Sequence, residues 1–207
     1  LVEQAKKAGL SCIAVVDHDT VEGIEPCLEA GRRLGVEVIS GIEFTSEYEG
    51  QEIHILGYFI DYCNRALLEK LGLLKEYRVQ RIYKMAEKLK DMGLVLNPQN
   101  VFDLSQQGTV GRLHFARAMV KEGLVSSIHE AFAKYIGDKC PAYVLGFRIS
   151  PSEVSRLIKD AGGIPVLAHP CTLNNDGLIL KLIKDGMMGL EVYYPEHSQS
   201  RIDSYLN

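Results

Sequence analysis

The sequence predicts a mixed α/β fold that is interrupted by a mostly helical insertion. Toward both ends of the chain, short apolar runs alternate with segments of helical periodicity. Apolar runs of this length are typical of strands that are buried on both faces of a sheet. Between residues 65 and 148 the alternation stops and helical spacing takes over. We therefore expect residues 1–64 and 149–207 to form one α/β part, with residues 65–148 inserted as a helical cap domain.

Composition places the chain among ordinary globular proteins. Its 207 residues are 46% hydrophobic and 24% charged, which is enough to bury a sizeable core. The net charge of −4 and the pI near 5.9 argue against broad attraction to duplex DNA or to an anionic membrane. Five scattered cysteines without a Cys-x-x-Cys pair suggest neither a disulfide framework nor a thiolate zinc site. We expect a cytoplasmic protein, because no membrane-spanning run or signal peptide is evident.

The first α/β unit ends its strand in three titratable residues. A helix over residues 1–9 precedes the apolar run 11–16, which breaks into Asp17-His18-Asp19-Thr20. Thr20 is expected to cap a helix that runs to about residue 34. In barrels and doubly wound sheets, active sites form where strands end in this way. The alternative is that the two aspartates only shape the turn and that His18 is incidental.

The next strand, from residue 36, leads into a predicted β-hairpin with its turn at Glu49-Gly50. That turn places Thr45 opposite His54 and makes Glu43 the diagonal neighbour on the same face. A carboxylate and an imidazole in this arrangement can share one metal ion. The alternative is a solvated polar face that carries a single histidine.

The insertion is predicted to be built from helices. Apolar residues recur at helical spacing between residues 65 and 92, as one helix or a helix pair. Loops are expected at 97–98 and 105–108, followed by helices over 112–122 and 126–136.

After the insertion the α/β alternation resumes. Ser150-Pro151-Ser152-Glu153 is a helix-capping signature that opens a helix ending near residue 162. A strand over 164–168 ends in His169. A helix over about 176–185 and a strand over 189–193 follow, and His197 lies shortly after that strand. Two further histidines therefore follow the ends of apolar strands.

These placements predict one shared site. Parallel strands bring their carboxyl ends together, so we expect His18, Glu43, His54 and His169 to converge. A shell of imidazoles and carboxylates without thiolates suits Zn²⁺, Mn²⁺ or Fe²⁺ and favours hydrolytic chemistry over a closed structural site. Two or three such ions can lower the pKa of a bound water and hold a phosphoryl group for in-line attack.

The motifs that carry these residues resemble those of the PHP (polymerase and histidinol phosphatase) family. The resemblance covers nearly the whole chain and rests on four segments: Val16-Asp17-His18-Asp19-Thr20, Gly41-Ile42-Glu43, Glu52-Ile53-His54-Ile55-Leu56-Gly57 and Leu167-Ala168-His169-Pro170. It implies a distorted (β/α)7 barrel that holds up to three divalent ions, with Mn²⁺ preferred among the candidates. It also implies that the four residues are metal ligands, with Glu43 bridging two ions.

Two family motifs are missing from this sequence. The opening His-x-His pair and the closing Asp-x-His, which complete the family's metal sites, are not found. We therefore expect a fragment of a longer protein, a barrel that is incomplete at both ends, and impaired turnover by these 207 residues alone.

The insertion narrows the resemblance to one branch of the family. Residues 111–117 and 133–139 resemble the cap of PHP enzymes that remove phosphate from nucleotides, including nucleoside 3′,5′-bisphosphate phosphatases and 5′ to 3′ exoribonucleases. The expected substrate-binding residues are Arg112, His114, Lys134, Tyr135, Lys139 and, from the rim of the site, His197. An arginine and a histidine near a helix start suit phosphate binding. The alternative is a solvated basic helix face with Phe115 in the core.

The leading hypothesis is a metal-dependent phosphoesterase that acts on a small nucleotide or a short RNA end. The acidic overall charge argues against long duplexes, which need an extended basic surface. One alternative is a histidinol-phosphate phosphatase. Another is a non-catalytic PHP module whose metals serve structure or regulation.

Overall fold

A computed structural model describes residues 1–105, 108–147, 149–173 and 177–206. The chain divides into two compact units. The first unit combines Leu1–Lys70 with Arg148–Asn207, and the second comprises Leu71–Phe147. Among the described residues, no helix combines the length and apolar character that crossing a membrane requires.

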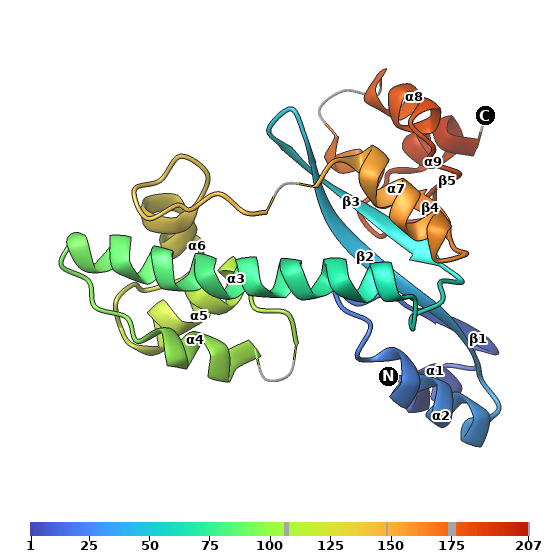
Figure 1. The fold of residues 1–207 in the computed structure, drawn as a ribbon, viewed down its shortest axis with the longest axis horizontal. Helices are drawn as coiled ribbons and strands as arrows, with labels where there is room; N and C mark the ends of the chain where they lie inside the picture. Colours follow the sequence, from blue (N-terminus) through green and yellow to red (C-terminus); the bar gives the residue numbers. More distant parts are fainter. Residues whose placement is uncertain (106–107, 148, 174–176, 207) are drawn as a thin grey trace. The chain divides into compact units, whose positions relative to one another are not determined.

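The first unit is organised around a five-stranded mixed sheet with the order β1-β2-β3-β4-β5 (Figure 1). β1 pairs parallel with β2, the next two pairings are antiparallel, and β4 and β5 are again parallel. Four strands, all except β3, therefore run in the same direction, so their carboxyl ends share one edge of the sheet. The strands are Cys12–Val15 (β1), Glu37–Tyr48 (β2), Gln51–Tyr58 (β3), Ile164–Leu167 (β4) and Gly189–Leu190 (β5).

The predicted hairpin register is confirmed. Thr45 pairs with His54, and the turn lies at Glu49 and Gly50, where both residues have positive φ. The two-residue period of the strands separates the faces of the hairpin. Glu43, Thr45 and His54 share one face, whereas the fully buried Ile42, Phe44 and Ile55 lie on the other.

Helix α7 covers this apolar face of the hairpin. It contacts both β2 and β3, and Figure 1 shows it alongside the sheet. Ile158 of α7 packs where Gly57 leaves no side chain, since a Cβ there would lie 3.0 Å from Ile158 Cγ1. The predicted capping is confirmed, because the Ser150 hydroxyl accepts a hydrogen bond from the Glu153 amide at 3.3 Å. The helices of this unit are Val2–Lys7 (α1), Ile24–Leu34 (α2), Pro151–Asp160 (α7), Gly177–Lys184 (α8) and Gln199–Leu206 (α9).

Two expectations about the elements of this unit need correction. Helix α2 begins at Ile24, not at Thr20. Thr20 instead accepts a hydrogen bond from the Glu22 amide at 3.2 Å, closing a local turn before the helix. Strand β5 is only two residues long, because the chain leaves the sheet after Leu190. The last helix of the unit, α9, forms at the end of the chain, where the sequence has helical character. The expected helix start at residue 176 lies outside the described residues.

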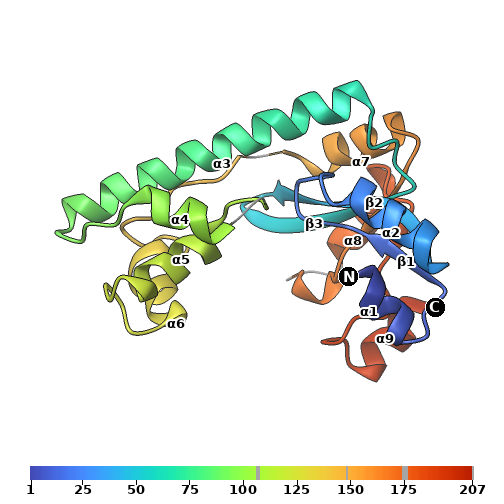
Figure 2. The ribbon, with the colours of Figure 1, turned by 90° about the horizontal axis from the view of Figure 1, so that it is seen from below.

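The second unit is helical, as the periodicity predicts. Residues 65–91 form one continuous helix, α3, whose part from Leu71 onward belongs to this unit. Figure 2 shows the other helices of the unit gathered along the C-terminal part of α3. Their shared core includes Met85, Leu89, Phe115 and Met119, all with 0% exposure. The elements are Arg65–Asp91 (α3), Pro98–Ser105 (α4), Arg112–Lys121 (α5), Ile128–Ala131 (α6) and a π-helix over Phe132–Ile136. Helix α4 was not foreseen, and residues 106–107 of the expected loop at 105–108 are outside the described residues.

Candidate metal centre

The fold brings the four predicted ligands to one edge of the sheet. His18 follows β1 and His169 follows β4, at the carboxyl ends of two strands that run in the same direction. Glu43 and His54 lie on the same face of the hairpin formed by β2 and β3. An isolated parallel bridge between His18 and Glu43 extends the pairing of β1 and β2 into the site.

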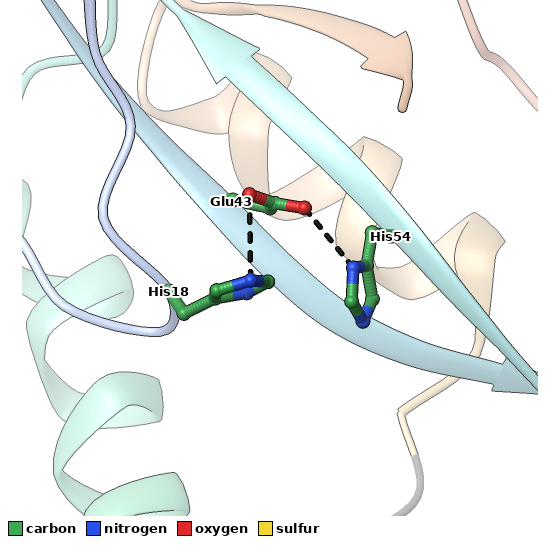
Figure 3. Close-up of side chains that lie close together, drawn as sticks. All are labelled: His18, Glu43 and His54. Atoms are coloured by element: carbon green, nitrogen blue, oxygen red, sulfur yellow. Dashed lines mark ion pairs between the residues drawn. The ribbon is translucent and has the colours of Figure 1, made fainter. Parts of the chain in front are cut away.

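Glu43 lies at the centre of this cluster (Figure 3). Its Oε2 atom is 3.5 Å from His18 Nε2, and its Oε1 atom is 3.0 Å from His54 Nδ1. The same Oε1 atom is 3.2 Å from His169 Nε2. A single carboxylate thus contacts three imidazoles through both of its oxygens.

The spacing of these atoms fits a metal site. His54 Nδ1 and His169 Nε2 are 3.1 Å apart, so together with Glu43 Oε1 they form a triangle with sides of 3.0 to 3.2 Å. Donor atoms that bind one ion at about 2.1 Å and at right angles are about 3.0 Å apart. The donor atoms of His18, Glu43 and His54 also lie within 4.8 Å of one another. The donor set and its spacing therefore suit a divalent cation of the Zn²⁺, Mn²⁺ or Fe²⁺ type.

Neighbouring side chains in the cluster shift the pKa values of Glu43 and His54 in opposite directions. Burial would raise the pKa of Glu43, but hydrogen bonds from His169 and His54 and the nearby imidazoles lower that pKa to about 2. Burial would likewise lower the pKa of His54, but the hydrogen bonds and charges of Glu43 and Glu52 raise it to about 9. These shifts correspond to an ionised Glu43 that faces a protonated His54 at neutral pH.

Asp19 supports the site through the backbone of β2. Its amide donates to the Glu43 carbonyl at 2.9 Å, and its buried carboxylate accepts from the Thr45 amide at 2.9 Å. Asp19 also has a φ of 51°, a left-handed conformation that aspartate tolerates better than most residues. The Asp19 carboxylate thus provides an acceptor for the Thr45 amide of β2, at a point where the backbone after β1 turns away from β2. Asp19 therefore shapes the turn, as one of the two interpretations has it, while His18 lies beside Glu43.

Replacing Asp19 by alanine is expected to destabilise the protein by about 1–3 kcal/mol, because the Thr45 amide loses its buried acceptor. Asparagine in its place would keep both an acceptor oxygen and the tolerance for positive φ, so Asp19→Asn should cost less. Urea unfolding of the two variants measures the difference. Equal destabilisation by both substitutions would show that the charge of Asp19 matters more than its hydrogen bond.

Sequence reasoning did not single out Glu191. This residue follows β5 and its Oε2 accepts a hydrogen bond from the His169 amide at 2.7 Å. The signal was present, because Glu191 follows an apolar strand as His18 and His169 do. Histidines at strand ends are the more conspicuous signal, so this glutamate was overlooked.

The predicted residues of the insertion all lie in the second unit. Arg112 pairs with Asp138 at 2.7 Å, and its guanidinium lies over the rings of Phe132 and Tyr143. His114 accepts a hydrogen bond from the Gly111 amide at 3.2 Å, and burial together with nearby arginines lowers its pKa. Lys134, Tyr135 and Lys139 occupy the π-helix and the turn that follows it. Lys134 pairs with Glu130 at 2.8 Å, Tyr135 packs against the helical core, and Lys139 is exposed.

His197 lies in the first unit and is buried, with 8% exposure. Its Nδ1 atom hydrogen bonds with the Val192 carbonyl at 2.8 Å, and its ring packs between Tyr194 and Tyr205. Tyr194 in turn contacts the ring of His169. The expected contact of His197 with substrate stays a prediction.

The three imidazoles gathered around Glu43 are a donor set that suits a metal-dependent hydrolase. The chain is 33% identical over 189 residues to a 5′-3′ exoribonuclease of Haemophilus influenzae, covering 89% of this chain and 68% of the relative. It is also 29% identical to a 3′,5′-nucleoside bisphosphate phosphatase of Chromobacterium violaceum, covering 96% of this chain and 72% of the relative. The chain belongs to the PHP-like phosphoesterase family of these proteins.

A solved structure supports the same assignment. A protein of Bifidobacterium adolescentis, named as a suspected metal-dependent phosphoesterase, superposes with a TM-score of 0.86 at 30% identity. The superposition covers 99% of this chain and 74% of the other. No family model matches the chain. The chain spans about two thirds to three quarters of the length of these relatives.

Proposed function

We propose that this chain carries the metal centre of a phosphoesterase that hydrolyses a phosphate ester on a small nucleotide or on a short RNA end. The observation that supports this most strongly is the contact of Glu43 with three imidazoles. A carboxylate shared by three histidines fits a hydrolytic metal site, and the named relatives act on nucleotides or RNA. The sheet of the first unit is proposed to be part of a distorted PHP barrel, with residues 65–148 as its cap.

Four residues are proposed as ligands in this chain, namely His18, Glu43, His54 and His169. When bound, divalent cations such as Mn²⁺ supply a water of lowered pKa and neutralise the charge of a phosphoryl group. The protein contributes the four donor side chains and the backbone that places them. Glu43 and His54 come from paired strands, while His18 and His169 are held by backbone hydrogen bonds next to those strands.

Residues of the second unit are proposed to bind the substrate. Arg112 is the main candidate, because its guanidinium is already oriented by two aromatic rings and by Asp138. A planar guanidinium suits the oxygens of a phosphate in a bidentate contact. We propose His114, Lys134, Tyr135 and Lys139 as further contacts to the nucleotide and His197 as a contact from the first unit.

The test measures binding and turnover on the 207-residue chain. Isothermal titration calorimetry with Mn²⁺ is followed by titration with a nucleoside 3′,5′-bisphosphate, a 5′-phosphorylated RNA dinucleotide and histidinol phosphate. Phosphate release from the same compounds is then measured with and without Mn²⁺. We expect Mn²⁺-dependent binding of the two nucleotide ligands. We expect slow release, because the family resemblance implies further ligands in motifs that this sequence lacks.

Arg112→Ala and Lys84→Ala serve as a matched pair in this test. Arg112→Ala should weaken binding of the bisphosphate while leaving Mn²⁺ affinity unchanged. Lys84 is an exposed cation of α3 in the same unit and should have no effect. Tighter binding of histidinol phosphate than of the two nucleotide ligands would replace nucleotides with histidinol phosphate as the proposed substrate. If none of the three phosphorylated compounds binds in the presence of Mn²⁺, the proposed function is contradicted.

A further inference from the structure

The carboxylate of Glu191 is tied to the backbone of His169. The Leu167 and Leu190 pairing of β4 with β5 places Glu191 beside the turn that follows β4, and the Glu191 amide donates to the Leu167 carbonyl at 2.9 Å. Glu191 Oε2 then accepts from the His169 amide at 2.7 Å. A backbone amide that donates to a charged carboxylate forms one of the stronger hydrogen bonds in proteins.

The backbone of His169 needs such a restraint. Its φ of 28° and ψ of 61° lie in the left-handed region, which L-residues other than glycine adopt only at a cost. The neighbouring groups restrain the same turn. The Ala168 amide donates to the His54 carbonyl at 3.0 Å, and the Thr172 hydroxyl donates to the His169 carbonyl at 3.0 Å. Glu191 is the member of this set that binds the His169 amide itself.

The conformation of His169 determines where its imidazole lies. With this backbone, His169 Nε2 is 3.2 Å from Glu43 Oε1 and 3.1 Å from His54 Nδ1. A relaxed φ would rotate the side chain out of this triangle, because φ sets the direction of the Cα to Cβ bond relative to the preceding strand. The hydrogen bond to Glu191 and the placement of the imidazole are therefore parts of one arrangement.

We propose that Glu191 is a positioning residue for the metal centre, one that holds His169 in its left-handed conformation and thereby directs the imidazole toward Glu43 and His54. This inference rests on the proposed function, since it concerns the metal centre proposed above. A helper residue of this kind typically changes metal affinity about 10- to 100-fold when it is removed.

The test compares three substitutions that separate shape from hydrogen bonding. Glu191→Gln keeps an acceptor oxygen at nearly the same place, Glu191→Met keeps the bulk without the acceptor, and Glu191→Ala removes both. We expect Mn²⁺ affinity to fall about 10- to 100-fold in the alanine and methionine variants and to stay close to wild type in the glutamine variant. Glu196→Ala, an exposed glutamate of the same segment, is the matched control and should bind Mn²⁺ as wild type does.

A second readout does not require metal. In ¹⁵N-labelled metal-free protein, the His169 amide proton should resonate far downfield, keep much of that shift in Glu191→Gln, and lose it in Glu191→Met. If the alanine variant does not fold, the methionine and glutamine variants carry the comparison.

The outcomes distinguish this inference from the proposed function. A wild-type chain that binds no Mn²⁺ contradicts the metal centre, while the His169 amide signal still tests the role of Glu191. Unchanged Mn²⁺ affinity in Glu191→Met overturns the positioning role. An equal loss in Glu191→Gln and Glu191→Met overturns it as well, because the charge of Glu191 would then matter rather than its hydrogen bond.

Discussion

Glu43→Gln is expected to abolish Mn²⁺ binding at micromolar concentrations and, with it, any metal-dependent phosphate release. Both carboxylate oxygens of Glu43 face imidazole nitrogens, at 3.0 to 3.5 Å. Glutamine has the same size but no charge, and its amide nitrogen cannot donate an electron pair to an ion. One of the two donor oxygens of residue 43 is therefore lost, and the remaining oxygen is a weaker ligand because it is uncharged. The loss should exceed the about 10- to 100-fold effect of removing a group that only orients a ligand.

Calorimetric titration with Mn²⁺ measures this effect, and circular dichroism shows whether the variant is folded. Glu37→Gln is the matched control, because Glu37 is an exposed glutamate at the start of the same strand. It should leave Mn²⁺ affinity unchanged. A Glu43→Gln protein that is folded and binds Mn²⁺ as tightly as wild type would show that the ion, if any, is held elsewhere.

Binding of Mn²⁺ is expected to release a proton and to strengthen with rising pH. In the metal-free protein the pKa of His54 is about 9, because Glu43 and Glu52 outweigh the effect of burial. His54 is therefore protonated at pH 7 and must lose its proton to become a ligand. Apparent Mn²⁺ affinity should rise about tenfold per pH unit between pH 7 and 9, since each bound ion displaces one proton.

Calorimetry in buffers of different ionisation enthalpy counts the released protons. About one proton per ion is expected at pH 7. In Glu52→Gln, which removes one cause of the raised pKa of His54, the pH dependence should shift to lower pH. Mn²⁺ affinity that is flat between pH 7 and 9 would show that His54 is neutral in the metal-free protein or does not bind the ion.

The interaction between Glu43 and His54 also makes the stability of the metal-free protein depend on pH. A raised pKa means that the His54 contribution is fully present below about pH 6.5 and is lost as pH rises through about 9. A lowered pKa means that the Glu43 contribution is present above about pH 4.5 and is lost as pH falls through about 2. The contact between Glu43 and His54 contributes to both shifts, so the two are not added, and His169, His18 and Glu52 account for the rest. A shift of this size corresponds to at most about 3 kcal/mol. Metal-free protein should therefore be most stable between about pH 4.5 and 6.5 as far as this pair is concerned.

Local rules were sufficient for much of the fold. The two-residue turn at Glu49 and Gly50 fixed the register of the hairpin. A one-residue slip would move Ile55 off the face on which Ile42 and Phe44 are buried. The capping residues of α7 marked its start for a similar reason, since the hydrogen bond involved spans only three residues. Thr20 misled because its hydroxyl can serve both in a turn and at a helix start, and here it accepts from the Glu22 amide in a turn that precedes α2.

The sequence by itself determined that His18 and His169 follow strand ends, that Glu43 and His54 share one face of a hairpin, and that these residue types suit a divalent cation. Only the tertiary structure decided that one carboxylate contacts all three imidazoles, and that Asp19 and Glu191 hold the backbone beside them. The physical reason is the range of the interactions. Periodicity and capping act over a few residues, whereas the contact between Glu191 and His169 exists only once β4 and β5 have paired.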